Sequence, residues 1–166
     1  MRETALGLWE RTKRNHGLEH ATIALLLGRH SQGRPLAGYS APFGFVVLGE
    51  LDADEVENAA REALRRMQGG EGDLAVSPFC GTNIVVGAGL ATMAAVAGHR
   101  LAGGGLSGLS RAFSCTALAI AASRPLGRLV QQRFTTSPDV GNMAIDQVSG
   151  VDLGRVSAHW VATRFG

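Results

Sequence analysis

An uncharged stretch in the middle of the chain constrains its fold most. From Leu74 to Gly98 there are 25 residues without a charged side chain, and residues 74–127 contain three arginines and no acid. Residues 1–73, by contrast, hold nine basic and eleven acidic residues. So little charge makes a poor surface for a soluble domain, where charged side chains normally face water. The pattern is typical of membrane-spanning helices or of wholly buried ones.

Two apolar runs within this region predict a helical hairpin. Residues 82–101 reach the length of about 20 residues that a spanning helix needs. The second run has twelve residues between Arg111 and Arg124, and it spans only if both arginines reach the interfaces. Small residues recur at every fourth position in the first run, at Gly87, Ala91 and Ala95. This spacing permits close helix packing in lipid. We predict a transmembrane hairpin over residues 82–127; the alternative is a buried hairpin in a soluble protein.

The charges around the hairpin predict its orientation. Both flanks of a hairpin lie on one side of the membrane, and Arg124, Arg128 and Arg133 at its end fit the basic excess of cytoplasmic segments. The N-terminus has no apolar signal core, so the flanks are expected in the cytoplasm, where thiols stay reduced. A disulfide between Cys80 and Cys115 is therefore not expected, and Cys115 is interpreted as a packing residue.

Periodicity and turn residues predict an α+β fold around the hairpin. We expect helices over residues 3–29 and 52–68, the second amphipathic, and a loop over 29–42. Strands are expected over residues 43–51, 73–78, 128–136, 142–150 and 155–165. The order strand, helix, strand favours a βαβ-type unit in a small mixed sheet. We expect one domain, residues 1–166, with an N-terminal α/β part (1–81), the hairpin (82–127) and a C-terminal β part (128–166).

The first predicted helix carries the sequence His16-Gly-Leu-Glu19-His20. Imidazoles four residues apart share one helix face and can bind a single zinc ion. Glu19 would then act as the general base that takes a proton from water at the metal. This is the H-x-x-E-H pattern of a class of zinc peptidases. The alternative is an ordinary polar helix face on which Glu19 pairs with an arginine.

A zinc site needs at least one further protein ligand. Cys80, in the stretch PFCGTN, is the first candidate because a thiolate binds zinc well. Glu57 and Glu50 are the next candidates, and His159 is the fourth. The alternative for Cys80 is a small buried residue without a ligand role.

Three stretches of the chain resemble an uncharacterised bacterial membrane-protein family. They are RNHGLEHATIALL, LAVSPFCGTNIVV and RPLGRLVQQRFTTSPDV. That family has an N-H-A-L-E-H-A-T-like signature, a C-G-T-N element and predicted membrane helices. The resemblance covers most of the chain and implies a place in the bacterial inner membrane, but no activity. It draws attention to His16, Glu19, His20 and Cys80.

The H-x-x-E-H motif alone is also similar to that of the pitrilysin and insulysin peptidases. This similarity implies ligand, base and ligand roles for His16, Glu19 and His20. It also implies a glutamate ligand on a second helix, for which Glu57 or Glu62 is available. Those peptidases are far larger than this chain.

Two functions follow as expectations. The first is a membrane-associated zinc hydrolase, peptidase-like, that acts on a peptide or a small molecule. The second is a non-catalytic membrane scaffold that forms homo-oligomers through the Gly/Ala faces of the hairpin, with a structural metal or none. The net charge of +2 and the scattered arginines do not suggest a nucleic-acid partner, so lipid is the expected partner.

Overall fold

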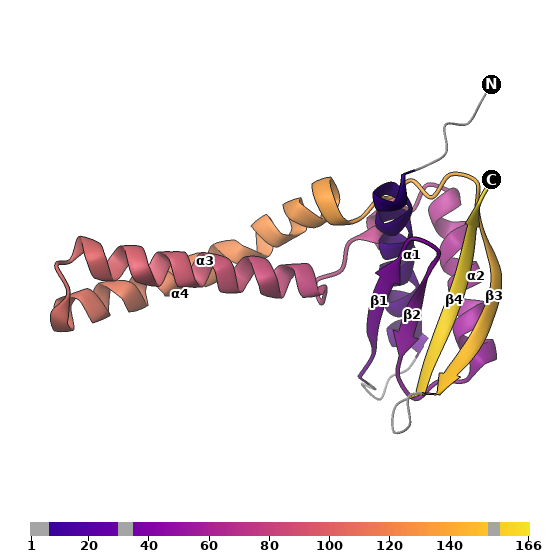
Figure 1. Cartoon of the computed structure of the whole chain (residues 1–166), viewed down its shortest axis with the longest axis horizontal. Helices are drawn as coiled ribbons and strands as arrows, with labels where there is room; N and C mark the ends of the chain where they lie inside the picture. Colours follow the sequence, from indigo (N-terminus) through magenta and orange to yellow (C-terminus); the bar gives the residue numbers. More distant parts are fainter. Residues whose placement is uncertain (1–6, 30–34, 153–156) are drawn as a thin grey trace. The chain divides into compact units, whose positions relative to one another are not determined.

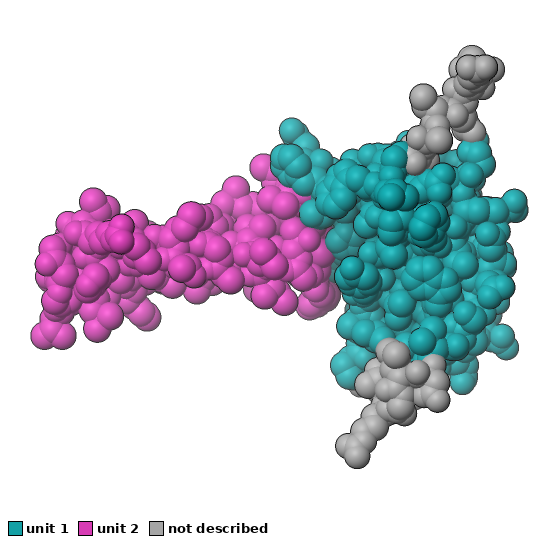
Figure 2. Space-filling model, viewed as in Figure 1, with its two compact units in different colours: residues 1–77, 132–166 teal, residues 78–131 magenta. Residues whose placement is uncertain are grey.

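The computed structural model describes residues 7–29, 35–152 and 157–166. The chain divides into two compact units, which Figure 2 colours separately. Residues 1–77 and 132–166 form the sheet unit, and residues 78–131 form the hairpin unit. The predicted N-terminal and C-terminal parts therefore contribute to one sheet unit.

The sheet unit packs two helices on a four-stranded sheet, with the strand order β1-β2-β4-β3 (Figure 1). All neighbouring strands are antiparallel. The α+β class is therefore confirmed, whereas the βαβ-type unit is wrong. The elements are α1 (Leu8–Arg29), β1 (Ala37–Ala41), β2 (Gly44–Leu48), α2 (Ala53–Gln68), β3 (Met143–Asp152) and β4 (Ser157–Phe165).

The core of this unit lies between the helices and the sheet. Alternate residues of β2, Phe45 and Val47, are wholly buried, as period-two side-chain orientation requires. They pack with Leu18 of α1 and Val56 of α2. A buried polar link adds to this contact: Asn15 of α1 donates to the Ala41 carbonyl at 2.8 Å and accepts from the Thr163 hydroxyl at 2.7 Å. Helix α1 is thereby held in one register on the sheet.

Several predicted elements of this unit are confirmed. The helix over 52–68 is α2, and the strands over 43–51, 142–150 and 155–165 are β2, β3 and β4, shifted at their ends. Helix α1 begins at Leu8; the predicted residues 3–6 lie outside the described residues, as do 155 and 156. Asp52 stands at the N-cap of α2, although its side chain makes no capping hydrogen bond.

Three predicted segments are wrong. Strand β1 occupies part of the predicted loop, and pairs with β2 from Ala37 to Ala41. The predicted strand over 73–78 is instead a short 3₁₀ helix, η1 (Gly72–Ala75). The predicted strand over 128–136 is the end of a helix, because α4 continues to Val130 and a turn of π-helix, η2 (Gln131–Thr135), follows it.

The hairpin unit consists of α3 (Gly81–Leu101) and α4 (Gly105–Val130). Helix α4 begins before Arg111 and runs on through Pro125, so it is far longer than the predicted apolar run. The turn is made by Gly103, Gly104 and Gly105, whose φ angles of 75°, 81° and 65° favour glycine. In the described part of the chain, both helices are long and apolar enough to cross a membrane.

Small residues bring α3 and α4 together. A Cβ on Gly98 would lie 3.0 Å from the Cα of Ala112, and one on Gly87 would lie 3.5 Å from the Ser123 hydroxyl. Gly87, one of the small residues predicted for helix packing, thus faces the other helix of the same chain. Large apolar side chains point outward instead. Exposed examples are Ile84, Val85, Leu106, Phe113 and Leu118.

Candidate metal centre

Helix α1 presents His16 and His20 as one pair. Their ring centroids are 4.4 Å apart, because residues four apart lie one above the other on a helix. His20 is buried, and His16 is partly exposed. The helix is continuous through Gly17, as the predicted metal motif requires.

Each imidazole is oriented by a backbone carbonyl. His16 Nδ1 lies 2.8 Å from the carbonyl oxygen of Thr135, and His20 Nδ1 lies 2.8 Å from that of Ala75. These residues are the last of η2 and η1, where carbonyls lack a partner within the helix. A carbonyl oxygen only accepts, so Nδ1 carries the hydrogen in both rings. In a neutral ring the lone pair is then on Nε2, which is one of the two nitrogens through which histidine binds metals.

Gly17, between the two histidines, permits this arrangement. A Cβ at this position would collide with the carbonyl oxygen of Ser137 and lie 3.2 Å from the Cβ of Ala75. The Ser137 amide also donates to the Lys13 carbonyl at 3.0 Å. The glycine therefore lets the segments that carry both carbonyl acceptors lie directly against α1.

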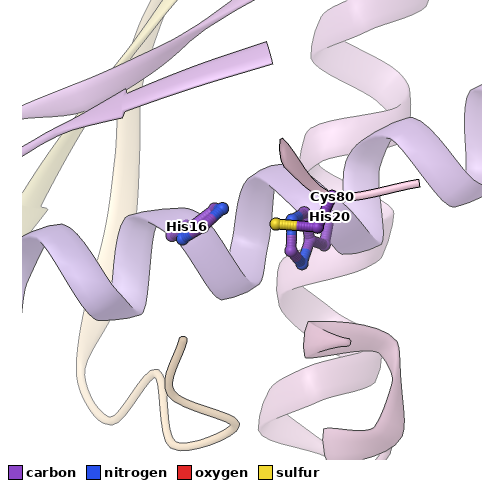
Figure 3. A group of neighbouring side chains, drawn as sticks. All are labelled: His16, His20 and Cys80. Carbon is purple, nitrogen blue, oxygen red and sulfur yellow. The ribbon is translucent and has the colours of Figure 1, made fainter. Parts of the chain in front are cut away.

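Cys80 is the third residue of the candidate centre. It is buried, has no disulfide, and is the N-cap of α3, where its Sγ accepts from the Thr82 amide at 3.4 Å. Figure 3 shows its side chain beside those of His16 and His20, and the ligand atoms of the three lie within 4.8 Å of one another. Tetrahedral zinc, with bonds of about 2.0 to 2.3 Å, separates its ligand atoms by roughly 3.5 Å. The cluster therefore has the residue types and the closeness that could hold a metal ion.

The other candidate ligands lie elsewhere. Glu57 pairs with Arg61 along α2 at 2.8 Å, and Glu62 pairs with Arg29. His159, in β4, has its Nε2 2.8 Å from the Leu51 carbonyl. Glu50 lies between β2 and α2. Among the described residues, none of these four belongs to the histidine and cysteine group.

Glu19, the predicted base, points toward β1. Its carboxylate is buried and accepts a hydrogen bond from the Ser40 hydroxyl. It also lies against Gly38, where a Cβ would collide with the carboxylate. Glu19 is therefore next to the histidine pair in sequence but is held by a different element. Its role as a base stays a prediction.

A pocket of about 380 Å³ adjoins the segments that orient the imidazoles. Ala75, whose carbonyl lies at His20, is one of its lining residues, and Thr136 follows Thr135, whose carbonyl lies at His16. Pockets of this size bind small ligands or parts of larger ones. The described lining residues are Gly70, Gly72, Asp73, Ala75, Val76, Gln132, Thr136 and Pro138.

Comparison with known proteins places the chain in a family. Residues 11–148 match the model of a domain of unknown function, DUF6391. The chain belongs to this family. It is also 32% identical, over 168 residues, to an uncharacterized protein of Picosynechococcus sp., a match that covers 90% of this chain and 78% of the relative. The expected membership of an uncharacterised family is therefore confirmed.

The comparisons assign no activity to the site. No solved structure matches the chain. Neither the family nor the relative is a peptidase by description, so the likeness to pitrilysin and insulysin stays at the level of the motif.

Some site groups were missed at the level of sequence. The carbonyls of Ala75 and Thr135 are backbone groups that every residue carries, so no residue type could have marked them. The sequence does not mark Ser40 as a site residue, because its strand lies within the segment that turn residues predict to be a loop. Gly17 was the one available signal, because a glycine inside a helix often marks a close approach.

Proposed function

We propose that this protein is a membrane-associated zinc protein with a metal-dependent, peptidase-like hydrolytic activity. One observation carries the proposal: both imidazoles of the pair have Nδ1 hydrogen-bonded to a backbone carbonyl. Such bonds fix the tautomer and the ring orientation before a metal arrives, and are typical of metal-binding histidines.

The donor set favours zinc. Two imidazoles and one thiolate form a borderline-soft set that suits zinc in tetrahedral geometry. Three protein ligands leave one position open, as in catalytic rather than structural zinc sites. Zinc bound there would lower the pKa of a water molecule and would polarise a carbonyl group. Glu19 is the proposed proton acceptor, and its carboxylate accepts a hydrogen bond from the Ser40 hydroxyl in this structure.

The proposed membrane location is supported by the surface of the hairpin unit. Leu118 is 72% exposed and Phe113 is 78% exposed, although both are large and apolar. Transfer of such side chains from water to lipid is favourable by about 25 cal/mol per Å² of apolar surface. The arginines at the base of the hairpin favour the cytoplasmic side of the bacterial inner membrane for the sheet unit.

A second candidate function is favoured by the position of Glu19. Its hydrogen bond from Ser40 and its contact with Gly38 would also suit a residue that joins α1 to β1. In that case the metal is structural or absent, and the protein is a non-catalytic membrane scaffold that forms homo-oligomers through its hairpin. The two candidates differ in whether Glu19 has chemistry to perform.

The metal site is tested first by the metal content of the purified full-length protein. We expect about one zinc per chain, and loss of that zinc in the His16→Ala/His20→Ala double variant and in Cys80→Ser. His99→Ala is the matched control, because His99 lies in the hairpin unit near the turn and should leave zinc unchanged. Wild-type protein that folds but takes up no zinc would overturn the proposal.

Hydrolysis is tested with Glu19→Gln and Ser40→Ala. If Glu19 is the base, Glu19→Gln abolishes cleavage of a casein substrate while zinc stays at one per chain, and Ser40→Ala keeps most of the activity. If Glu19 is structural, both variants lower the unfolding temperature. An inactive wild-type protein with full zinc would contradict the hydrolase and favour the second candidate.

A further inference from the structure

We propose that the pocket between η1 and residues 132–138 binds the substrate, and that this substrate is a polypeptide segment with a basic side chain, presented at the membrane surface. The inference rests on the proposed hydrolase and adds its substrate class.

The pocket adjoins the metal centre through two segments that orient the imidazoles, although none of His16, His20 and Cys80 is among its described lining residues. Segment 70–76 lines the pocket and ends beside the Ala75 carbonyl that orients His20. Segment 132–138 forms the opposite wall and contains the Thr135 carbonyl that orients His16. The two walls meet closely at Gly72, where a Cβ would lie 2.9 Å from the Cβ of Pro138. A ligand in the pocket is therefore bound by the two segments that orient the imidazoles.

The lining favours a peptide with a positive charge. Among the described lining residues, Asp73 is the one that carries a charge, and it is exposed. Gln132, which is exposed, adds a side-chain amide that can hydrogen-bond to peptide groups. A phospholipid headgroup would need arginine or lysine for its phosphate, and neither lines the pocket among the described residues.

The covalent chain keeps this pocket close to the ends of the apolar helices. Val76 is five residues before Gly81, where α3 begins, and Gln132 is two residues after Val130, where α4 ends. An extended chain covers at most about 3.5 Å per residue. Val76 and Gln132 therefore lie within roughly 18 Å of the ends of the two helices, and so of the proposed membrane. A substrate anchored in the same membrane stays within this distance of the pocket. Its effective concentration at the pocket is therefore high.

Binding tests the pocket separately from catalysis. The zinc-loaded Glu19→Gln protein is reconstituted in phosphatidylcholine vesicles with a fluorescent ten-residue Ala/Leu peptide that carries one central lysine. A second probe has glutamate in place of lysine, and each probe is made with and without a C-terminal spanning helix. We expect the lysine probe to bind about tenfold more tightly than the glutamate probe. The anchored lysine probe should bind at least tenfold more tightly than the soluble one.

Charge reversal at the pocket is the decisive variant. Asp73→Arg should invert the preference, so that the glutamate probe binds more tightly, without loss of zinc. Asp54→Arg, an exposed acid at the start of α2, is the matched control and should change neither preference. An unchanged preference in Asp73→Arg would overturn the assignment of this pocket as the binding site. Equal binding of anchored and soluble probes would overturn the inference that the substrate is held at the membrane. Tight, charge-dependent binding without cleavage by zinc-loaded wild type would support the pocket and overturn the hydrolase.

Discussion

The two units of this chain arrange the same kinds of side chain in opposite ways. In the sheet unit, Leu18 and Phe45 are wholly buried, and charged residues such as Arg66 and Glu71 are at the surface. In the hairpin unit, large apolar side chains such as Leu118 are exposed. The buried residues of its helices are small, such as Gly98, Gly108 and Ala112, and at the base of the hairpin Gln131 is wholly buried and donates to Asn83 Oδ1 at 2.8 Å.

This contrast fits the proposed membrane location of the hairpin unit. Burial of apolar area drives folding in water, so the sheet unit has its large hydrophobic residues inside. In lipid that driving force between helices is absent, and close packing of small residues with interhelical hydrogen bonds replaces it. Asn83 also donates to the Pro78 carbonyl at 2.9 Å, so the polar groups at the base of the hairpin satisfy one another. The surface of the sheet unit is thus of the kind that water favours, and that of the hairpin unit is of the kind that lipid favours.

The largest expected difference is in the response to truncation of a leucine. Leu18→Ala should lower the free energy of unfolding of the sheet unit by about 2 to 5 kcal/mol, because it leaves a cavity in a closed core. Leu118→Ala should leave that free energy nearly unchanged. Tryptophan fluorescence measures the sheet unit alone, because both tryptophans, Trp9 and Trp160, belong to it. Equal losses of unfolding free energy in the two variants would contradict the proposed difference between the units.

A charge placed on the hairpin tests whether lipid or water surrounds it. Leu118→Arg, in the middle of α4, should oppose membrane insertion by about 3 kcal/mol. Leu101→Arg is the control: Leu101 is similarly exposed, at 77%, but ends α3 at the turn. The measurement is the fraction of protein that stays with membranes after carbonate extraction. If the hairpin stands in water, the two arginine variants behave alike.

The smallest expected effect concerns pH. A hydrogen bond from the Arg66 guanidinium holds the pKa of Glu71 below its usual value. This pair therefore contributes stability above the ordinary glutamate pKa, and loses it as the pH falls through the lower pKa of the folded state. Arg66→Gln should raise the pKa of Glu71 to its ordinary value in a carboxyl NMR titration. An unchanged pKa would show that the hydrogen bond is not its cause. The hairpin unit, without a single acid in residues 78–131, has no carboxylate side chain to titrate.

The sequence predicted elements whose signals are local. Helix α2 has acids in its first turn, arginines in its last and two glycines after it, so its bounds were close to those observed. Strand β1 has no such signal, because Ala-Gly-Tyr-Ser-Ala lies among turn residues and becomes a strand by pairing with β2. The segment 128–136 reads equally as a strand or as a helix end, and the continuation of α4 decided between them.

The sequence predicted the candidate ligands of the site but not the backbone carbonyls that orient them. Four-residue spacing implied that His16 and His20 share a face, and Cys80 was the preferred third ligand. Nothing in the sequence could reveal that Thr135 and Ala75 would supply the orienting carbonyls, because they are 119 and 55 residues from the histidines they meet. Such long-range pairing follows from the tertiary fold and not from residue type.

The position of β4 has a consequence for how this protein is made. It is the last strand in sequence, yet it lies between β2 and β3. The ribosome therefore delivers both apolar helices before it delivers the strand that joins the two sides of the sheet. A stop codon shortly before Ser157 would leave β2 and β3 without their common neighbour, and would expose the edges of both strands to pairing with other chains.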